Sequence, residues 1–68
     1  MSLIGNELPE GLGFRLALDM EAMKNFANLS DQGKEQLVDY IKSSTTGDEA
    51  KNRVTEVVRN LHTGGALH

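Results

Sequence analysis

The sequence predicts an all-α domain, a small bundle of two short N-terminal helices followed by two longer helices. Apolar residues recur at the three- and four-residue spacings of a helical face, and strand-like alternation is missing. Residues typical of helix starts and ends separate these periodic segments. We therefore expect one helical domain at residues 9–63, a flexible N-terminal tail at residues 1–8 and a frayed C-terminal tail at residues 64–68.

The first helix is expected at residues 10–18. Pro9 suits the start of a helix, where its missing N–H would have had no partner. Leu12, Phe14 and Leu16 are the candidate anchors of this helix in the core. Two glycines inside the segment each cost ~1 kcal/mol relative to Ala, so the helix is expected to have low stability by itself.

A second short helix is expected at residues 20–28, and Asp19 is suited to cap its start. Its apolar residues follow the spacings of one helical face, and so small a domain needs all of them in its core. These residues are Met20, Met23, Phe26 and Ala27. The pattern alone allows either a break at Asp19 or a continuous helix.

The third helix is expected at residues 32–43. Ser30 can accept a hydrogen bond from the free amides of the first turn, and Asp31 suits the positive helix end. Tyr40 is expected to be half-buried, with its hydroxyl at the edge of the core. The other apolar residues are Leu37, Val38 and Ile41, and the residues expected to face outward are Lys34, Glu35, Asp39 and Lys42.

The fourth helix is expected at residues 47–62. Thr46 and Glu49 form a capping pattern, in which hydroxyl and carboxylate satisfy free amides at the helix start. Glu49 and Arg53 are spaced to pair on the helix surface. Gly64 suits the left-handed residue that ends many helices. An apolar stripe is expected to pack against Leu16, Phe26, Leu37 and Ile41, and its residues are Ala50, Val54, Val57, Val58 and Leu61.

The joint at residues 43–46 has three interpretations. A phosphate-binding loop needs the pattern Gly-x-x-x-x-Gly-Lys-Ser/Thr after a strand, and this chain has neither the lysine nor the strand. Phosphorylation of the hydroxyl groups from Ser43 to Thr46 is a second interpretation, but Asp48 and Glu49 would repel the phosphate. Because these two acidic residues already occupy the positive helix end, we interpret the segment as a capped connection between helices.

No catalytic, cofactor-binding or metal-ligating residue is expected. The chain has no Cys, and His62 and His68 are its only histidines, too few for a zinc site of three or four ligands. No Ser or Thr has the surroundings of a nucleophile, and the adjacent Asp48 and Glu49 diverge on a helix. His62 is expected to interact with the negative end of its own helix.

The charge pattern bears on the class of partner. The net charge is −3, and no run of Lys or Arg could neutralise several phosphates at once. The third and fourth helices, joined by a few residues, could form a DNA-reading pair, but the acidic residues of the fourth helix balance its basic ones. A small nucleic-acid-binding domain is therefore the alternative function and not the leading one. No apolar stretch approaches the ~20 residues of a membrane span, and the N-terminus lacks the pattern of an export signal. We expect a cytoplasmic location and no membrane partner.

These observations predict a non-catalytic protein–protein interaction module, either monomeric or weakly homodimeric. Tyr40 is the first candidate for its interface, because tyrosine is enriched in the hot spots of protein contacts. Lys42, Arg53 and Arg59 complete the candidate interaction surface. The identity of the protein partner is not encoded in any recognisable motif.

Four segments of the chain resemble the C-terminal helical segment of the bacteriocin-protection (YdeI/OmpD-associated) family. They are LPEGL, LALDMEAMKNFANLS, LVDYIKSS and AKNRVTEVVRNLHTGG, and together they cover about residues 8–64. The matching positions are Pro9, Leu18, Phe26, Leu29, Ser30, Tyr40, Ile41, Arg53, Val54, Val58, Leu61 and Gly64. The resemblance implies a helical fold with a break at Asp19, and a link to bacteriocin or stress tolerance in bacteria, but no activity.

The chain departs from this family in two respects. The family's joint before the last helix is typically basic, whereas this chain has Lys42-Ser43-Ser44 followed by Gly47-Asp48-Glu49. An anion-binding role for the joint is therefore not carried over from the resemblance. Longer relatives also carry an N-terminal domain ahead of the matching segment.

Overall fold

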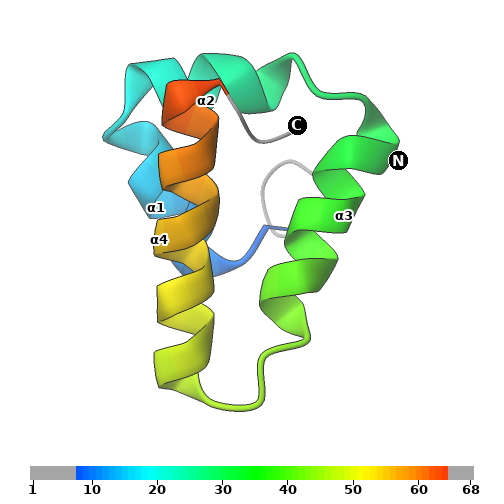
Figure 1. The fold of residues 1–68 in the computed structure, drawn as a ribbon, viewed down its shortest axis with the longest axis vertical. Coiled ribbons are helices and arrows are strands. Elements are labelled where there is room, and N and C mark those ends of the chain that lie inside the picture. The colour runs from blue at the N-terminus through cyan, green and yellow to red at the C-terminus, as the bar shows by residue number, and fades with distance from the viewer. Residues whose placement is uncertain (1–7, 65–68) are drawn as a thin grey trace.

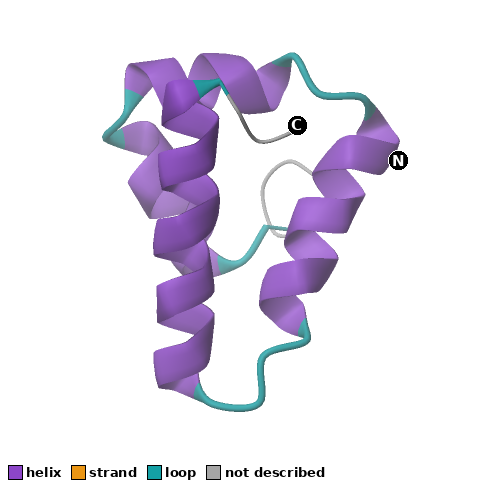
Figure 2. Ribbon diagram, viewed as in Figure 1, coloured by secondary structure: helices purple, strands orange, loops and turns teal. Residues whose placement is uncertain are grey.

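The computed structural model describes residues 8–64, which form four helices joined by short loops (Figure 2). The helices are α1 (Glu10–Ala17), α2 (Met20–Ala27), α3 (Asp31–Lys42) and α4 (Gly47–Thr63). No strand occurs within residues 8–64, and the predicted all-α class is confirmed. In Figure 1, α4 stands between α1 and α3, while α2 crosses near the C-terminal end of α4. The longest helix thus contacts each of the other three.

The expected tails fall largely outside the described part of the chain. Residues 1–7 and 65–68 are not described, so the expectation of flexible or frayed ends there stays a prediction. Leu8, which we assigned to the N-terminal tail, is half-buried and packs against the core. Gly64, which we assigned to the C-terminal tail, is the cap of α4.

Side-chain caps separate the first three helices, as the sequence predicts. The Asp19 carboxylate accepts a hydrogen bond from the Ala22 amide at 3.0 Å, and this cap separates α1 from α2. The Ser30 hydroxyl accepts one from the Gly33 amide, also at 3.0 Å, at the start of α3. Each hydroxyl or carboxylate satisfies an amide that has no partner within its own helix. The predicted break at Asp19 is therefore confirmed.

The last helix is capped at both ends. The Thr46 hydroxyl accepts a hydrogen bond from the Glu49 amide at 3.1 Å. The Glu49 carboxylate accepts from the backbone N–H of Thr45 at 2.9 Å, one residue earlier than the capping pattern predicts, and from the Thr45 hydroxyl at 3.0 Å. Gly64 ends the helix with φ 75°, a left-handed conformation in which a side chain would be strained.

Replacing Thr46 with Ala is expected to lower the free energy of unfolding by about 0.5–2 kcal/mol, because the Glu49 amide loses its acceptor. Chemical denaturation followed by circular dichroism measures this change. Thr46→Ser keeps the hydroxyl and serves as the matched control, so it should stay close to wild type. Equal stability of Thr46→Ala and wild type would show that this cap is dispensable.

The core is apolar throughout the described residues. Four of its members lie on α4, and the predicted stripe is buried there from Val54 to Leu61, while Ala50 is half-buried. Leu29 and Leu37 are partly buried against it. The core also includes Ala22, which the apolar pattern of the sequence did not predict. Its small side chain lets α2 pack closely on α4. The buried members of the core are Leu12, Leu16, Ala22, Phe26, Val38, Ile41, Val54, Val57, Val58 and Leu61.

The predicted core assignment is wrong for part of α1. Leu12 and Leu16, four residues apart, are buried, whereas Phe14 is 66% exposed. A helix turns by ~100° per residue, so Phe14 lies on nearly the opposite side from both leucines. Phe14 is consequently not an anchor of the core.

The predicted core assignment is also wrong for most of α2. Ala22 and Phe26 face the core, and the three other apolar residues lie ~80–140° from the middle of that face. Met20 is accordingly 86% exposed, Met23 is 41% exposed and Ala27 is exposed. Both short helices therefore bury one pair of residues and leave large apolar side chains on the surface.

Candidate functional site

Two of the predicted surface residues, Tyr40 and Arg53, come together between α3 and α4. The Arg53 guanidinium lies over the Tyr40 ring, 4.6 Å from its centroid. It donates hydrogen bonds to the Tyr40 carbonyl oxygen at 2.7 Å and the Ser43 hydroxyl at 2.9 Å. The predicted pair with Glu49 is present, at 2.7 Å. Arg53 thus joins the end of α3 to the start of α4.

Tyr40 and Arg53 are both engaged within the fold. The Tyr40 hydroxyl donates to the Glu56 carboxylate at 2.7 Å, and this hydrogen bond raises the pKa of Tyr40 above its ordinary value. The Tyr40 side chain is 40% exposed, so it is more open to solvent than the half-buried ring that the sequence predicts. Lys42 and Arg59 are exposed, and no interaction within residues 8–64 joins either of them to this pair. Of the four predicted surface residues, the structure therefore brings together only Tyr40 and Arg53.

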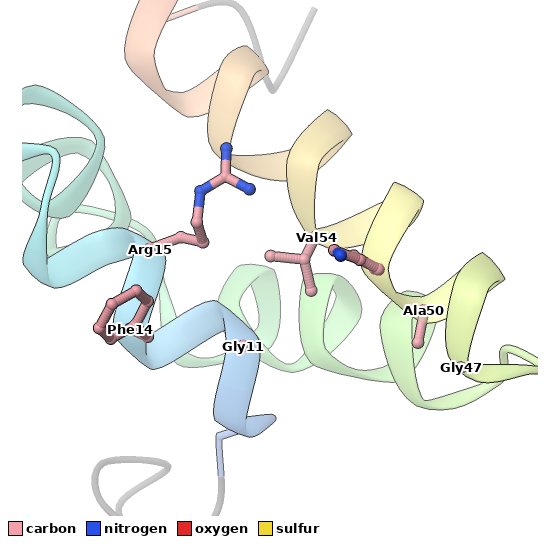
Figure 3. Close-up of a pocket in the computed structure, with 7 residues that line it drawn as sticks. Gly11, Phe14, Arg15, Gly47, Ala50 and Val54 are labelled. Carbon is pink, nitrogen blue, oxygen red and sulfur yellow. The ribbon is translucent and has the colours of Figure 1, made fainter.

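A groove that the sequence did not predict lies between α1 and α4, with a volume of about 440 Å³ (Figure 3). In Figure 3, the Val54 side chain projects from α4 toward α1, and Arg15 projects from α1 toward α4. Arg15 donates a hydrogen bond to the Thr55 hydroxyl at 3.1 Å, across the two helices. The lining residues are Gly11, Phe14, Arg15, Gly47, Ala50, Lys51 and Val54.

Small residues keep this groove open. A β-carbon added at Gly11 would lie 3.8 Å from the Val54 side chain, which is ordinary contact distance. One added at Gly47 would meet nothing within 4 Å. Both glycines have backbone conformations that other residues adopt, since the only positive φ among the described glycines is at Gly64. The space beside them is therefore a consequence of their missing side chains.

A second cavity of about 290 Å³ lies on another side of α1. The Lys34 ammonium lies 5.9 Å from the centroid of the Phe26 ring beside it. Gly13 lines this cavity whereas its neighbour Phe14 lines the groove. The lining residues are Leu8, Gly13, Leu16, Met23, Phe26, Ala27 and Lys34. The helix α1 thus lies between two apolar depressions.

His62 pairs with Asp19 rather than acting only on its own helix end. Its Nδ1 lies 3.0 Å from both oxygens of the Asp19 carboxylate. The hydrogen bond between the two side chains raises the pKa of His62 above its ordinary value of 6.5. It also lowers the pKa of Asp19 below its ordinary value of 3.8. Nearby, the Asn25 side chain donates to the Leu61 carbonyl oxygen at 2.6 Å. These two contacts join α2 to the end of α4.

The Asp19–His62 pair is expected to make stability depend on pH. Because the pKa of His62 is raised, its contribution is complete below 6.5 and is lost as pH rises through the folded-state value. Because the pKa of Asp19 is lowered, its contribution is present above 3.8 and is lost as pH falls through the folded-state value. The stability difference between wild type and His62→Gln should therefore be largest between pH 3.8 and 6.5.

Urea unfolding at several pH values measures this difference, and Asp19→Asn supplies the control background. Asn retains a side-chain oxygen for the α2 cap but carries no charge. In that background, His62→Gln should have an effect that no longer varies with pH. A difference between wild type and His62→Gln that stays constant from acidic to neutral pH would contradict the expectation.

Among the residues whose side chains the structure describes, there is no group of three or more His, Cys, Asp or Glu that could hold a metal ion. Within the same residues, no helix is both long enough and apolar enough to cross a membrane. Comparisons of the chain with protein-family models, with curated proteins and with solved structures give no match.

Proposed function

We propose that this chain is a non-catalytic protein–protein interaction module that binds its partner through the groove between α1 and α4. The observation that carries the proposal is the exposure of Phe14, which is 66% exposed at a groove lined largely by apolar and small residues. Exposed apolar patches framed by polar residues mark interaction surfaces in soluble proteins. Aromatic side chains are also enriched in the contacts that contribute most to binding.

The exposure of apolar residues around α1 and α2 is unusual for so small a domain. A chain of this length has little apolar surface to spare, because it buries only ~60% of its unfolded surface on folding. Nevertheless Leu18 is 71% exposed and Met20 is 86% exposed, in the short loop between α1 and α2 and at the start of α2. Met in particular adapts its shape to different partners. These residues extend the proposed contact beyond the groove.

The surface predicted from Tyr40, Lys42, Arg53 and Arg59 is the second place at which a partner could bind. The polar groups of Tyr40 and Arg53 already have partners inside the fold, and a protein binding there would have to replace those hydrogen bonds. A partner that binds in the groove would not have to replace such hydrogen bonds. This difference favours the groove over the α3–α4 surface.

The proposed setting is the bacterial cytoplasm, with a role in bacteriocin or stress tolerance. This part of the proposal rests on the resemblance to the bacteriocin-protection family and on the expected cytoplasmic location. The cellular setting and the mode of binding are independent, because binding in the groove does not depend on where the module acts.

Site-specific photo-crosslinking in the native host tests the proposal. The photoreactive residue p-benzoylphenylalanine replaces Phe14 in one variant and Tyr40 in another, so that two exposed aromatic positions on different faces are compared. We expect a discrete protein adduct from position 14 and none from position 40. An adduct from position 40 alone would place the interface on α3 and α4 instead.

The crosslinking result, combined with a retention assay on DNA and RNA, distinguishes the interaction module from the nucleic-acid-binding alternative. If neither position gives a protein adduct, and the purified chain is retained on DNA or RNA until salt is added, the nucleic-acid-binding alternative replaces the interaction module. Turnover of a substrate that one point mutation abolishes would overturn the non-catalytic assignment.

A further inference from the structure

We infer that the groove between α1 and α4 accepts an amphipathic helix of a partner protein, whose apolar stripe carries acidic residues along its edges. The inference rests on the proposed function and specifies the chemistry of the partner. Three features of the groove support it: its length along α4, its small lining residues, and the sign of its charged residues.

The length of the groove matches the contact stripe of a helix. Its lining residues on α4 run from Gly47 to Val54, and seven steps at 1.5 Å each span ~10 Å, about two helical turns. Helices that bind in grooves use apolar anchors at positions i, i+3 or i+4, and i+7, which cover the same two turns. One such stripe is therefore long enough to fill the groove.

The small lining residues allow a helix backbone to approach closely. Gly11, Gly47 and Ala50 project little or nothing from the two helices that form the walls. Val54 is 6% exposed and supplies the apolar floor, while Phe14 stands exposed at the edge. A leucine or phenylalanine anchor could thus contact Val54 from above and Phe14 from the side.

The charges of the groove favour an acidic partner. Among the lining residues whose side chains the structure describes, the charged ones are Arg15 and Lys51, and both are cations, although the chain as a whole has a net charge of −3. Of the five N–H donors of Arg15, one is used by Thr55 within residues 8–64. Glu49, two residues after Gly47 on α4, forms an ion pair with Arg53 and accepts a hydrogen bond from the Thr45 amide. Carboxylates beside the apolar stripe of the partner would therefore meet cations at the groove.

Nuclear magnetic resonance titration of the full-length, 15N-labelled chain with designed peptides tests this inference. The probe is a stapled peptide of about 18 residues, roughly five helical turns, with a leucine stripe and glutamates along its edges. A matched peptide carries lysines in place of the glutamates. We expect the amide signals of Gly11, Arg15, Gly47 and Lys51 to shift with the acidic peptide. The acidic peptide should bind about tenfold more tightly than the basic one, as two partly exposed ion pairs would give.

Two glycine variants localise the binding. Gly47→Leu fills the groove, and Gly13→Leu is its matched control, because a β-carbon added at either position meets nothing within 4 Å. Gly13 lines the second cavity and not the groove. Circular dichroism first establishes that both variants remain folded. We expect Gly47→Leu to weaken binding of the acidic peptide by about tenfold or more, and Gly13→Leu to bind like wild type.

Several outcomes would overturn the inference. Equal binding of acidic and basic peptides would contradict the acidic partner, and loss of binding in Gly13→Leu would move the site to the second cavity. Groove signals that shift with protein concentration alone would identify a second copy of this chain as the occupant. If no peptide binds but a protein adduct still forms at position 14, the interaction module stands and only the helical partner is wrong.

Discussion

Replacing Val58 with Asp is expected to abolish the folded state. Val58 lies in the middle of the buried stripe of α4 and is 4% exposed. The residues that the structure describes as buried are all apolar, so the new carboxylate would have no partner among them. Burying an unpaired charge costs several kcal/mol, whereas the core of so small a domain supplies only about 3–5 kcal/mol in total. The substitution should therefore exceed the available stability.

Circular dichroism and thermal melting measure this result, and Asn52→Asp is the control. Asn52 is exposed on the same helix, so this variant introduces the same charge without burying it. We expect Asn52→Asp to melt cooperatively and Val58→Asp to show neither helical signal nor a melting transition. A cooperative transition in Val58→Asp would mean that this side of α4 does not face the core.

Truncation of Leu16 to Ala is expected to have the second largest effect. Leu16 is 1% exposed and is one of the two residues that α1 contributes to the buried core. Removing its side chain loses buried apolar surface and leaves a void, which costs about 2–5 kcal/mol in well-packed proteins. This loss is comparable with the whole stability expected for a core of this size, about 3–5 kcal/mol. The variant should be mostly or wholly unfolded at ambient temperature.

Leu18→Ala is the matched control for Leu16→Ala, because the same atoms are removed two residues away. Leu18 is 71% exposed, so its truncation should change the free energy of unfolding by less than about 0.5 kcal/mol. Urea denaturation of both variants measures the difference. Similar losses in the two variants would contradict the assignment of opposite faces to Leu16 and Leu18.

The boundaries of the helices could be predicted from the sequence because they depend on local interactions. The caps at Asp19, Ser30 and Thr46 each join groups three residues apart, and such pairs are visible in a short window of sequence. Gly64 was predictable for a similar reason, since a left-handed helix end favours glycine. The buried stripe of α4 was predictable as well, because a helix of 17 residues repeats its apolar pattern several times.

The orientation of the short helices was not predictable from their apolar patterns. With 8 residues each, α1 and α2 contain two or three candidate faces and too few repeats to choose between them. Packing against α4 decided the choice: it buried Leu12 and Leu16 in α1, and Ala22 and Phe26 in α2. Phe14, Met20 and Met23 were left exposed as a result.

The candidate functional site was decided by tertiary structure alone. The groove combines Gly11, Phe14 and Arg15 with residues more than thirty positions later in the chain, and no local pattern connects them. The contact between Asp19 and His62 spans 43 positions and was missed for the same reason. The sequence by itself determined where the helices begin and end, because those interactions reach only three or four residues. Which faces meet, and which apolar side chains remain exposed, depended on how the helices pack together.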